Sequence, residues 1–273
     1  MRDVLIGIDA GTSVIKSVAF DLKGRQIASA AIPNAYETVG RTGAVQDMDR
    51  TWADTARTLV ELAGKVENLA SRVVAIAVTG QGDGTWLIDR DGEPVGKGWL
   101  WLDARAGDTV ARLRETGGDA ERFRHTGSGL AACQQGSQLR WMLDNAPEML
   151  DGATTGFHCK DWLYFKLTGR RATDPSEACF TFGNFRERAY SDTVIDFLDL
   201  RKQTYLLPEI VDGATTHHAL SDDAAALTGL PSGTPIVLGY VDVACTSLGA
   251  GLYDPGTDIG VSQRRAVCIP QPA

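Results

Sequence analysis

The sequence contains few cysteines, and none of them forms a Cys-x-x-Cys pair. A disulfide framework or a structural zinc site needs cysteines that are clustered or regularly spaced. The 273 residues hold only five, and these are widely scattered: Cys133, Cys159, Cys179, Cys245 and Cys268. The set predicts reduced thiols, and therefore a cytoplasmic protein without a cysteine-bound metal.

Long hydrophobic runs and an excess of positive charge are also missing. No apolar stretch approaches the roughly 18 residues of a membrane-spanning helix, and the apolar run that opens the chain is too short for a signal peptide. Lysine and arginine number 27 against 35 acidic residues, which gives a net charge of −8. This balance argues against nucleic-acid and membrane partners. The composition indicates a globular protein and says little about its substrate, because a site can be locally basic in an acidic protein.

Hydrophobic periodicity predicts strands near both ends of the chain and helices in the middle. Strands are expected over 4–9, 15–20, 25–32, 73–79 and 235–240. Helices are expected over 51–69, 104–115, 134–145, 160–167 and 222–228. Three antiparallel strands, a helix and a parallel strand follow one another in ribonuclease-H-like domains. The sequence thus predicts an α/β fold of this class, enlarged by helical insertions.

Two aspartates lie where predicted strands end. Asp9 ends the first strand and precedes the turn Gly11-Thr12-Ser13, whereas Asp242 follows the strand over 235–240. Amide-rich loops favour anionic oxygens, and a carboxylate beside one can hold Mg²⁺ through waters. A carboxylate at a strand end can also accept a proton from a substrate hydroxyl. The alternatives are that Asp9 caps an ordinary turn and that Asp242 caps a following helix.

Four blocks of sequence, in the same order, resemble the FGGY family of carbohydrate kinases. The blocks are Gly7–Ser13 with Lys16, Trp101–Arg105, Lys160–Ser176 and Leu206–Gly251. A single Asp-x-Gly-Thr match would be weak, but four ordered blocks between residues 3 and 260 make a specific resemblance. It implies an actin/hexokinase-superfamily fold and an enzyme that uses ATP and Mg²⁺ to phosphorylate a sugar or polyol.

The resemblance also implies roles for individual residues. Asp242 would be the catalytic base, and Asp9 would hold the metal. Four residues of the opening block would contact the ATP phosphates: Gly11, Thr12, Ser13 and Lys16. Four residues from two later segments would bind the substrate: Gln81, Asp83, Trp101 and Asp103.

The loop around Asp83 suggests the kind of substrate. Xylulose-kinase-like members carry a Met-His pair in this loop, and glycerol-kinase-like members carry an arginine followed by a carboxylate. Here Gly82 has no side chain and Asp83 supplies a carboxylate, which can accept from two neighbouring hydroxyls of an acyclic polyol. The segment Gln81–Trp86 resembles the erythritol kinase branch. The alternatives are a ketopentose, L-xylulose or D-xylulose, or a solvated turn without a binding role.

Three further side chains have two interpretations each. Trp86 and Trp101 either form walls of the substrate pocket or pack in the core. Arg105 and Asp103 either contact substrate hydroxyls or form a structural ion pair. The sequence does not choose between these roles.

The C-terminal stretch is short for a two-domain kinase. Residues 1–257 are predicted to be an N-terminal FGGY domain, and residues 258–273 the truncated start of a second domain or a disordered tail. About thirty residues after Asp242 are too few for a second nucleotide-binding domain. We therefore expect this chain to be the substrate-binding half, or a non-catalytic polyol-binding remnant. The surface that would face the second domain is expected to be apolar and to permit a homodimer.

Overall fold

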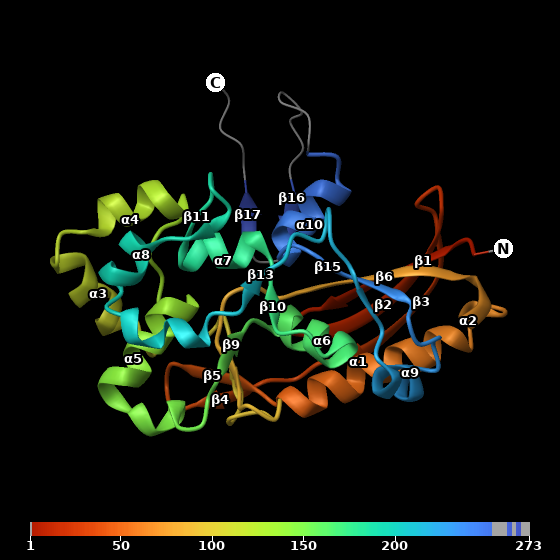
Figure 1. Ribbon diagram of the computed structural model, residues 1–273, viewed down its shortest axis with the longest axis horizontal. Coiled ribbons are helices and arrows are strands. Elements are labelled where there is room, and N and C mark those ends of the chain that lie inside the picture. Colours follow the sequence, from red (N-terminus) through yellow and green to blue (C-terminus); the bar gives the residue numbers. More distant parts are fainter. Residues whose placement is uncertain (1, 253–260, 264–265, 269–273) are drawn as a thin grey trace.

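The computed structural model describes residues 2–252, 261–263 and 266–268 (Figure 1). Its largest sheet has six strands in the order β14-β15-β6-β1-β2-β3. Their bounds are β1 (Val4–Ala10), β2 (Val14–Asp21), β3 (Gln26–Pro33), β6 (Val73–Gly80), β14 (His218–Ala219) and β15 (Pro235–Leu238). Strands β1, β6 and β15 are parallel to one another, and β2 runs antiparallel to β1. The expected three antiparallel strands followed by a parallel one are thereby confirmed.

The first strand shows why these residues form a sheet. Val4, Ile6 and Ile8 are buried on one face of β1, and the residues between them are more exposed. Helix α1 (Met48–Ala63) packs against β2 and β3. It begins after Asp47, whose carboxylate accepts from the N–H of Arg50 at 2.9 Å.

The predicted helix over 51–69 therefore starts earlier and ends earlier than expected. Gly64 follows its last residue, and a separate short helix, α2 (Leu69–Arg72), comes next. Between the two helices Asn68 adopts a left-handed backbone with φ 54°, which a continuous helix cannot contain.

The helical insertions gather at one end of the molecule, on the left in Figure 1. They are α3 (Gly107–Glu115), α4 (Asp119–Thr126), α5 (Gln135–Asn145) and α8 (Asp192–Phe197), with the 3₁₀ helices Pro147–Leu150 and Arg201–Leu206. This end has a hydrophobic core of its own, which includes Leu139, Met142 and Leu198. Helices α3 and α5 match the predicted ranges closely, whereas α4 and α8 were not predicted.

Four helices lie near the main sheet and the strands' ends: α6 (Cys159–Thr168), α7 (Pro175–Thr181), α9 (Asp222–Thr228) and α10 (Asp242–Gly249). Helix α6 ends at Gly169, whose φ of 72° is the left-handed cap expected there. Helix α9 has the predicted bounds. Helix α7, which the hydrophobic pattern did not predict, begins after Asp174, and that side chain accepts from two N–H groups of its first turn.

Short strands complete the fold. They are β4 (Glu37–Val39), β5 (Gly43–Gln46) and β8 (Gly98–Trp99) in one sheet, and the pairs β7 (Trp86–Ile88) with β9 (Thr155–Phe157), β10 (Ala172–Thr173) with β13 (Glu209–Ile210), and β11 (Gly183–Asn184) with β12 (Ala189–Tyr190).

The C-terminal segment contains two short strands where the structure describes it, and the predicted domain division stays a prediction. Strands β16 (Val261–Gln263) and β17 (Ala266–Cys268) pair antiparallel, with Ser262 opposite Val267. Residues 253–260, 264–265 and 269–273, with the predicted boundary after 257, lie outside the described residues. A hairpin of three-residue strands is too short to leave a clear periodicity in the sequence.

The described residues can be compared with two expectations from the sequence, which concern disulfide bonds and membrane-spanning helices. Four of the five cysteines form no disulfide there: Cys133, Cys159, Cys179 and Cys245. In the same part of the chain, no helix has both the length and the apolar character needed to cross a membrane.

Candidate functional site

The carboxyl ends of β1, β6 and β15 meet at one edge of the main sheet. In the register of these parallel strands, Asp9 lies opposite Thr79. The Thr79 hydroxyl donates to the Tyr240 carbonyl at 2.6 Å, which joins the segment after β15 to the end of β6. The Asp9 turn, the loop after β6 and the segment that leads to Asp242 therefore share this edge.

Asp9 is half-buried at the end of β1. Burial raises the pKa of its carboxyl, and the charge of Lys16, its partner on β2, opposes that shift. The structure thus places the two residues side by side, with Lys16 exposed. Ser13 is also exposed, whereas the Gly11 N–H is already donated to the Val14 carbonyl at 3.0 Å.

Asp242 is the first residue of α10 and does not belong to a strand. Strand β15 ends at Leu238, so the acid lies on a connection that turns into a helix. Its Oδ1 accepts from the N–H of Val243 at 2.7 Å. Burial raises the pKa of Asp242 to about 6, and the negative charges of Asp9 and Asp83 add to the shift. Asp242 is therefore close enough to each of the other two carboxylates to be repelled by it.

Asp83 adopts a left-handed backbone, with φ 54°. The Cys133 thiol donates to its Oδ2 at 3.3 Å, while its buried Oδ1 has no hydrogen-bond partner within the described structure. Burial raises the pKa of this carboxyl. Because buried polar atoms are normally paired, the unpartnered oxygen is a candidate acceptor for a ligand hydroxyl.

Thr12, Gln81 and Trp101 form a chain of hydrogen bonds. The Trp101 indole donates to the Thr12 hydroxyl at 2.8 Å, and that hydroxyl donates to Gln81 Oε1 at 2.8 Å. The buried Gln81 amide then donates to Gln46 Oε1 at 2.8 Å. Both ends of Gln81 are thus used within the protein, which makes it a link between loops. Trp101 remains partly exposed beside Thr12.

Asp103 and Arg105 form an ion pair. Arg105 contacts both carboxylate oxygens, the shortest contact being Nη2 to Oδ2 at 2.6 Å, and the N–H of Ala44 donates to Oδ2 at 2.8 Å. The guanidinium also stacks on the Trp99 ring, 3.2 Å from its centroid. Asp103 is buried and Trp86 is fully buried in the core. The structure therefore favours the ion-pair alternative for Asp103 and the core alternative for Trp86.

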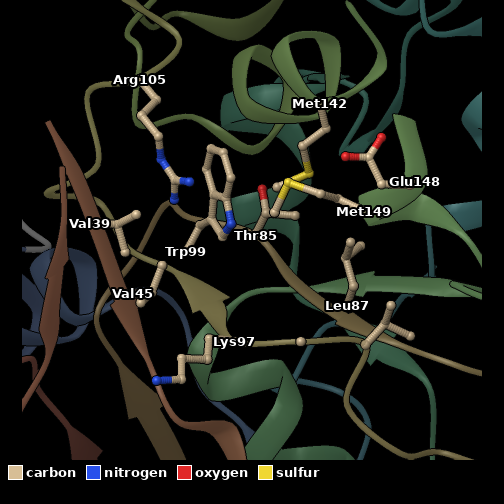
Figure 2. Close-up of a pocket in the computed structure, with 12 residues that line it drawn as sticks. Val39, Val45, Thr85, Leu87, Lys97, Trp99, Arg105, Met142, Glu148 and Met149 are labelled. Atoms are coloured by element: carbon tan, nitrogen blue, oxygen red, sulfur yellow. The ribbon is translucent and has the colours of Figure 1, made fainter. Parts of the chain in front are cut away.

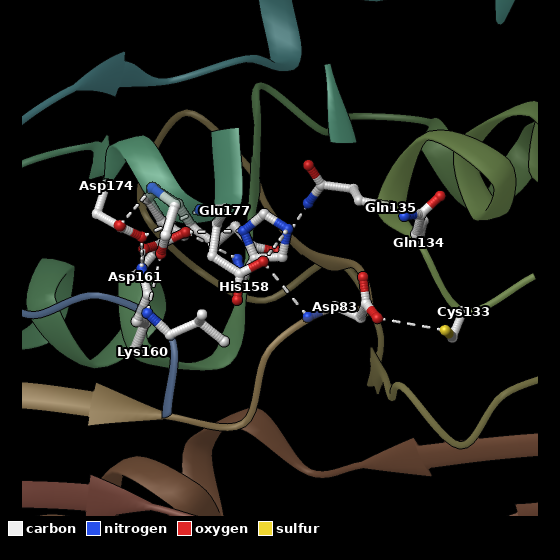
Figure 3. A network of polar contacts seen from close by, with 12 residues as sticks. Asp83, Cys133, Gln134, Gln135, His158, Lys160, Asp161, Asp174 and Glu177 are labelled. Atoms are coloured by element: carbon white, nitrogen blue, oxygen red, sulfur yellow. Dashed lines mark hydrogen bonds and ion pairs between the residues drawn. The ribbon is translucent and has the colours of Figure 1, made fainter. Parts of the chain in front are cut away.

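A buried charged network lies behind the Asp83 loop, and the expected roles did not include it (Figure 3). Lys160 Nζ lies 2.7 Å from Asp161 Oδ1 and 2.5 Å from Asp174 Oδ1. His158 Nδ1 lies 3.0 Å from Asp161 Oδ2, and His158 Nε2 lies 3.5 Å from Glu177 Oε2. All five side chains are buried. A sequence signal was present, because His158, Lys160 and Asp161 interrupt an otherwise apolar segment.

The charges in this network shift one another's pKa values. Although burial opposes ionisation, Lys160 and His158 lower the pKa of Asp161 to about 2. Burial raises the pKa of Glu177 to about 7, against the charges of His158 and Lys160. Burial thus brings the pKa of Glu177 close to neutral pH, whereas Asp161 stays ionised there.

A cavity of about 380 Å³ lies elsewhere, between β4, β5, β8 and α5 (Figure 2). Its walls are mostly apolar and include Val45, Trp99 and Met142, with Arg105 on one side. Its lining residues do not include Asp9, Asp83 or Asp242. The carboxylate edge of the sheet therefore remains the candidate site.

The acids at this edge do not form a ready-made metal cage. No group of three or more His, Cys, Asp or Glu side chains in the described part of the chain is arranged to hold a metal ion. Mg²⁺ does not require such a group, because it commonly binds through one or two carboxylates, waters and substrate phosphates. A cation beside Asp9 would also offset its repulsion with Asp242. The residues present therefore fit Mg²⁺ bound together with a phosphate substrate.

Comparison with known proteins gives one family match. Residues 4–249 match the model of the N-terminal domain of the FGGY family of carbohydrate kinases. The chain is similar to an erythritol kinase of Brucella abortus (strain 2308), with 58% identity over 260 residues that cover 95% of this chain and 50% of the relative. It is also similar to a probable L-xylulose kinase of Pasteurella multocida (strain Pm70), with 30% identity over 253 residues that cover 91% of this chain and 52% of the relative.

A solved structure supports the fold. The xylulose kinase from Rhodospirillum rubrum superposes with a TM-score of 0.87 and 26% identity, over 93% of this chain and 52% of that one. The chain thus spans about half the length of the curated relatives it matches.

Proposed function

The chain belongs to the FGGY family of carbohydrate kinases, and we propose that it forms the substrate-binding half of an ATP-dependent erythritol kinase. The observation that carries the proposal is that Asp242 lies close enough to both Asp9 and Asp83 for their charges to raise its pKa, while Asp83 keeps a buried, unpartnered oxygen. The 58% identity to an erythritol kinase supports a polyol substrate.

Each residue of the site then has a different proposed role. Asp83 would accept hydrogen bonds from hydroxyls of the polyol and hold it near Asp242. Asp242, with a pKa of about 6, is ionised at neutral pH and would accept the proton of the hydroxyl whose oxygen attacks. Asp9 would hold Mg²⁺, and the loop with Thr12 and Ser13 would face the phosphates. When bound, ATP supplies the phosphoryl group and Mg²⁺ offsets its negative charge.

Two alternatives make different predictions. The first is a ketopentose kinase, which the similarity to xylulose kinases favours, and the second is a non-catalytic polyol-binding protein. The first would turn over L-xylulose or D-xylulose in preference to polyols. The second would bind polyol without supporting turnover in any context.

A chimera separates these possibilities. Residues 1–252 of this chain would be joined to the second half of the Brucella abortus erythritol kinase, and kcat/KM would be measured for erythritol, glycerol, D-xylulose and L-xylulose. We expect erythritol to rank first. A ketopentose that ranks higher by about tenfold, which is about 1.4 kcal/mol in transition-state free energy, would overturn the polyol assignment. A chimera that folds but is inactive on all four would favour the non-catalytic alternative.

A further inference from the structure

Glu177 connects the buried charged network to the proposed polyol site. It lies in the first turn of α7, and its Oε2 accepts from the N–H of Asp83 at 3.4 Å (Figure 3). A Cβ atom on Gly82 would lie only 2.7 Å from Glu177 Oε1. The carboxylate therefore lies directly against the backbone of the loop that presents Asp83.

The conformation of Asp83 needs such support. Its φ of 54° is one that residues with a side chain rarely adopt. Besides Glu177, the loop is held by the Gly84 N–H, which donates to the Cys133 carbonyl at 2.9 Å, and by the Cys133 thiol on Asp83 Oδ2. Of these, Glu177 provides the acidic contact to the Asp83 backbone.

His158 in turn supports Glu177. Its Nδ1 is fixed on Asp161 at 3.0 Å, which directs Nε2 toward Glu177 Oε2 at 3.5 Å. Neither His158 Nε2 nor Glu177 Oε1 has a hydrogen-bond partner among the described residues. The charged or titratable groups that influence Glu177 come from α6, the start of α7, the Asp83 loop and the segment before α5: His158, Lys160, Asp174, Asp83 and Cys133.

We propose that His158 and Glu177 form a proton-dependent clamp that positions Asp83 for polyol binding. The inference rests on the proposed function, because it requires that Asp83 contacts the polyol. Ionised Glu177 accepts from the Asp83 N–H and attracts His158, so it holds the loop. Protonated Glu177 is a weaker acceptor and loses the attraction, so the loop is released.

The sign of the pH dependence follows. Burial raises the pKa of Glu177 to about 7, so the ionised clamp predominates above that pH and is lost as the pH falls through it. Polyol affinity should therefore decrease between about pH 8 and pH 6. Asp242 and Asp83 also have raised pKa values. The effect of the clamp is therefore the part of the pH profile of polyol affinity that disappears in Glu177→Gln.

The test is calorimetric titration of the 273-residue chain with erythritol across this pH range. We expect Glu177→Gln to bind roughly tenfold more weakly at about pH 8, the scale of a lost hydrogen bond to a charged group, and to lack the inflection near pH 7. His158→Gln should move the inflection to higher pH, because loss of the positive charge raises the pKa of Glu177 further. Thr181→Val is the matched control, since it alters a buried hydroxyl in the same helix without touching Asp83.

The outcomes of these titrations separate failure of the clamp from failure of the proposed function. A Glu177→Gln profile that keeps the wild-type inflection would refute the clamp, even if Asp83→Ala abolishes binding and so supports the polyol site. A wild-type chain that binds no polyol at any pH would refute the clamp and the proposed function together. Thermal melts check that each variant is folded, and if His158→Gln does not fold, the Glu177→Gln profile still decides.

Discussion

Asp242 and Asp83 differ in the groups that hydrogen-bond to their carboxylates. Asp242 uses one oxygen to accept from the N–H of Val243 at the start of α10, and its pKa is raised to about 6. Asp83 receives the Cys133 thiol on one oxygen and keeps the other unpartnered. The first is suited to accept a proton near neutral pH, and the second to accept hydroxyl donors.

Replacing Asp242 by asparagine should stop catalysis without preventing binding. In the chimera, Asp242→Asn should lower kcat by about 10²–10⁴-fold, the usual contribution of a general base. Erythritol affinity, measured by calorimetry, should change little because the side chain keeps its shape. A variant that retains more than about a tenth of the wild-type rate would contradict the assignment.

The pH dependence of kcat should report the same carboxylate. Asp242 can accept a proton only when ionised, so kcat at saturating erythritol should be level well above about pH 6 and fall about tenfold per unit below it. Measuring kcat instead of kcat/KM keeps the profile separate from effects on polyol affinity. A level profile down to about pH 5 would argue against Asp242 as the base.

Removal of the Asp83 carboxylate should weaken polyol binding. Asp83→Ala is expected to lose about 1–3 kcal/mol of erythritol binding free energy, as for hydrogen bonds to a charged group. Asp108→Ala, in the exposed first turn of α3, is the matched control and should bind like the wild-type chain. Unchanged affinity in Asp83→Ala would favour the solvated-turn interpretation of this loop.

At the scale of elements, α7 joins the two segments that carry the proposed site. Its Glu177 accepts from the N–H of Asp83, and its Ser176 hydroxyl accepts from the N–H of Val241 at 3.0 Å. No side chain of helix α10, which begins with Asp242, is fully buried, and Asp242 itself is half-buried. The position of Asp242 therefore depends on the connection to α7 more than on packing of its own helix.

The Asp83 loop, α7 and the segment before α10 approach one another closely at Gly82. A Cβ there would lie 2.4 Å from Val241 Cγ2 and 2.7 Å from Glu177 Oε1, so Gly82→Ala must displace one of them. We expect a loss of about 1–3 kcal/mol in unfolding free energy, as for overpacked sites, together with weaker erythritol binding. Gly107→Ala is the control, because its Cβ would meet no atom within 4 Å. Equal unfolding free energies for the two variants would contradict the close approach.

At the scale of the whole molecule, two hydrophobic cores support the described fold, one around the main sheet and one in the helical end. The candidate site lies at the carboxyl edge of that sheet. Val243 and Leu248 are exposed on α10. A homodimer through this surface stays a prediction.

Tested by itself, the 273-residue chain should bind erythritol without phosphorylating it. It spans about half the length of the relatives it matches. We expect a second domain to supply the remaining contacts to ATP. A coupled assay for ADP release should give less than about a hundredth of the chimera's rate, for which about 1–100 s⁻¹ is normal in kinases. A rate in that normal range from the chain alone would refute this expectation.

The sequence by itself determined the main strands, several of the helices and the family. Short runs of apolar and β-branched residues predicted β1, β2, β3 and β6, and Gly169 marked the end of α6, because these signals act between neighbours along the chain. Ordered motifs indicated an FGGY carbohydrate kinase, which the comparisons confirm. The predicted contacts of Asp9, Asp83 and Asp242 with ligands stay predictions.

Only the tertiary structure decided which polar groups already have hydrogen-bond or ion-pair partners within the protein. Gln46 and Thr12 hydrogen-bond to Gln81, and Arg105 pairs with Asp103, while the expected substrate contacts of Gln81 and Asp103 stay predictions. Glu177 contacts Asp83 across 94 positions of sequence, and no local pattern encodes that pairing. Burial then sets the pKa values of Asp242 and Glu177, because the cost of a charge depends on what surrounds it and not on its neighbours along the chain.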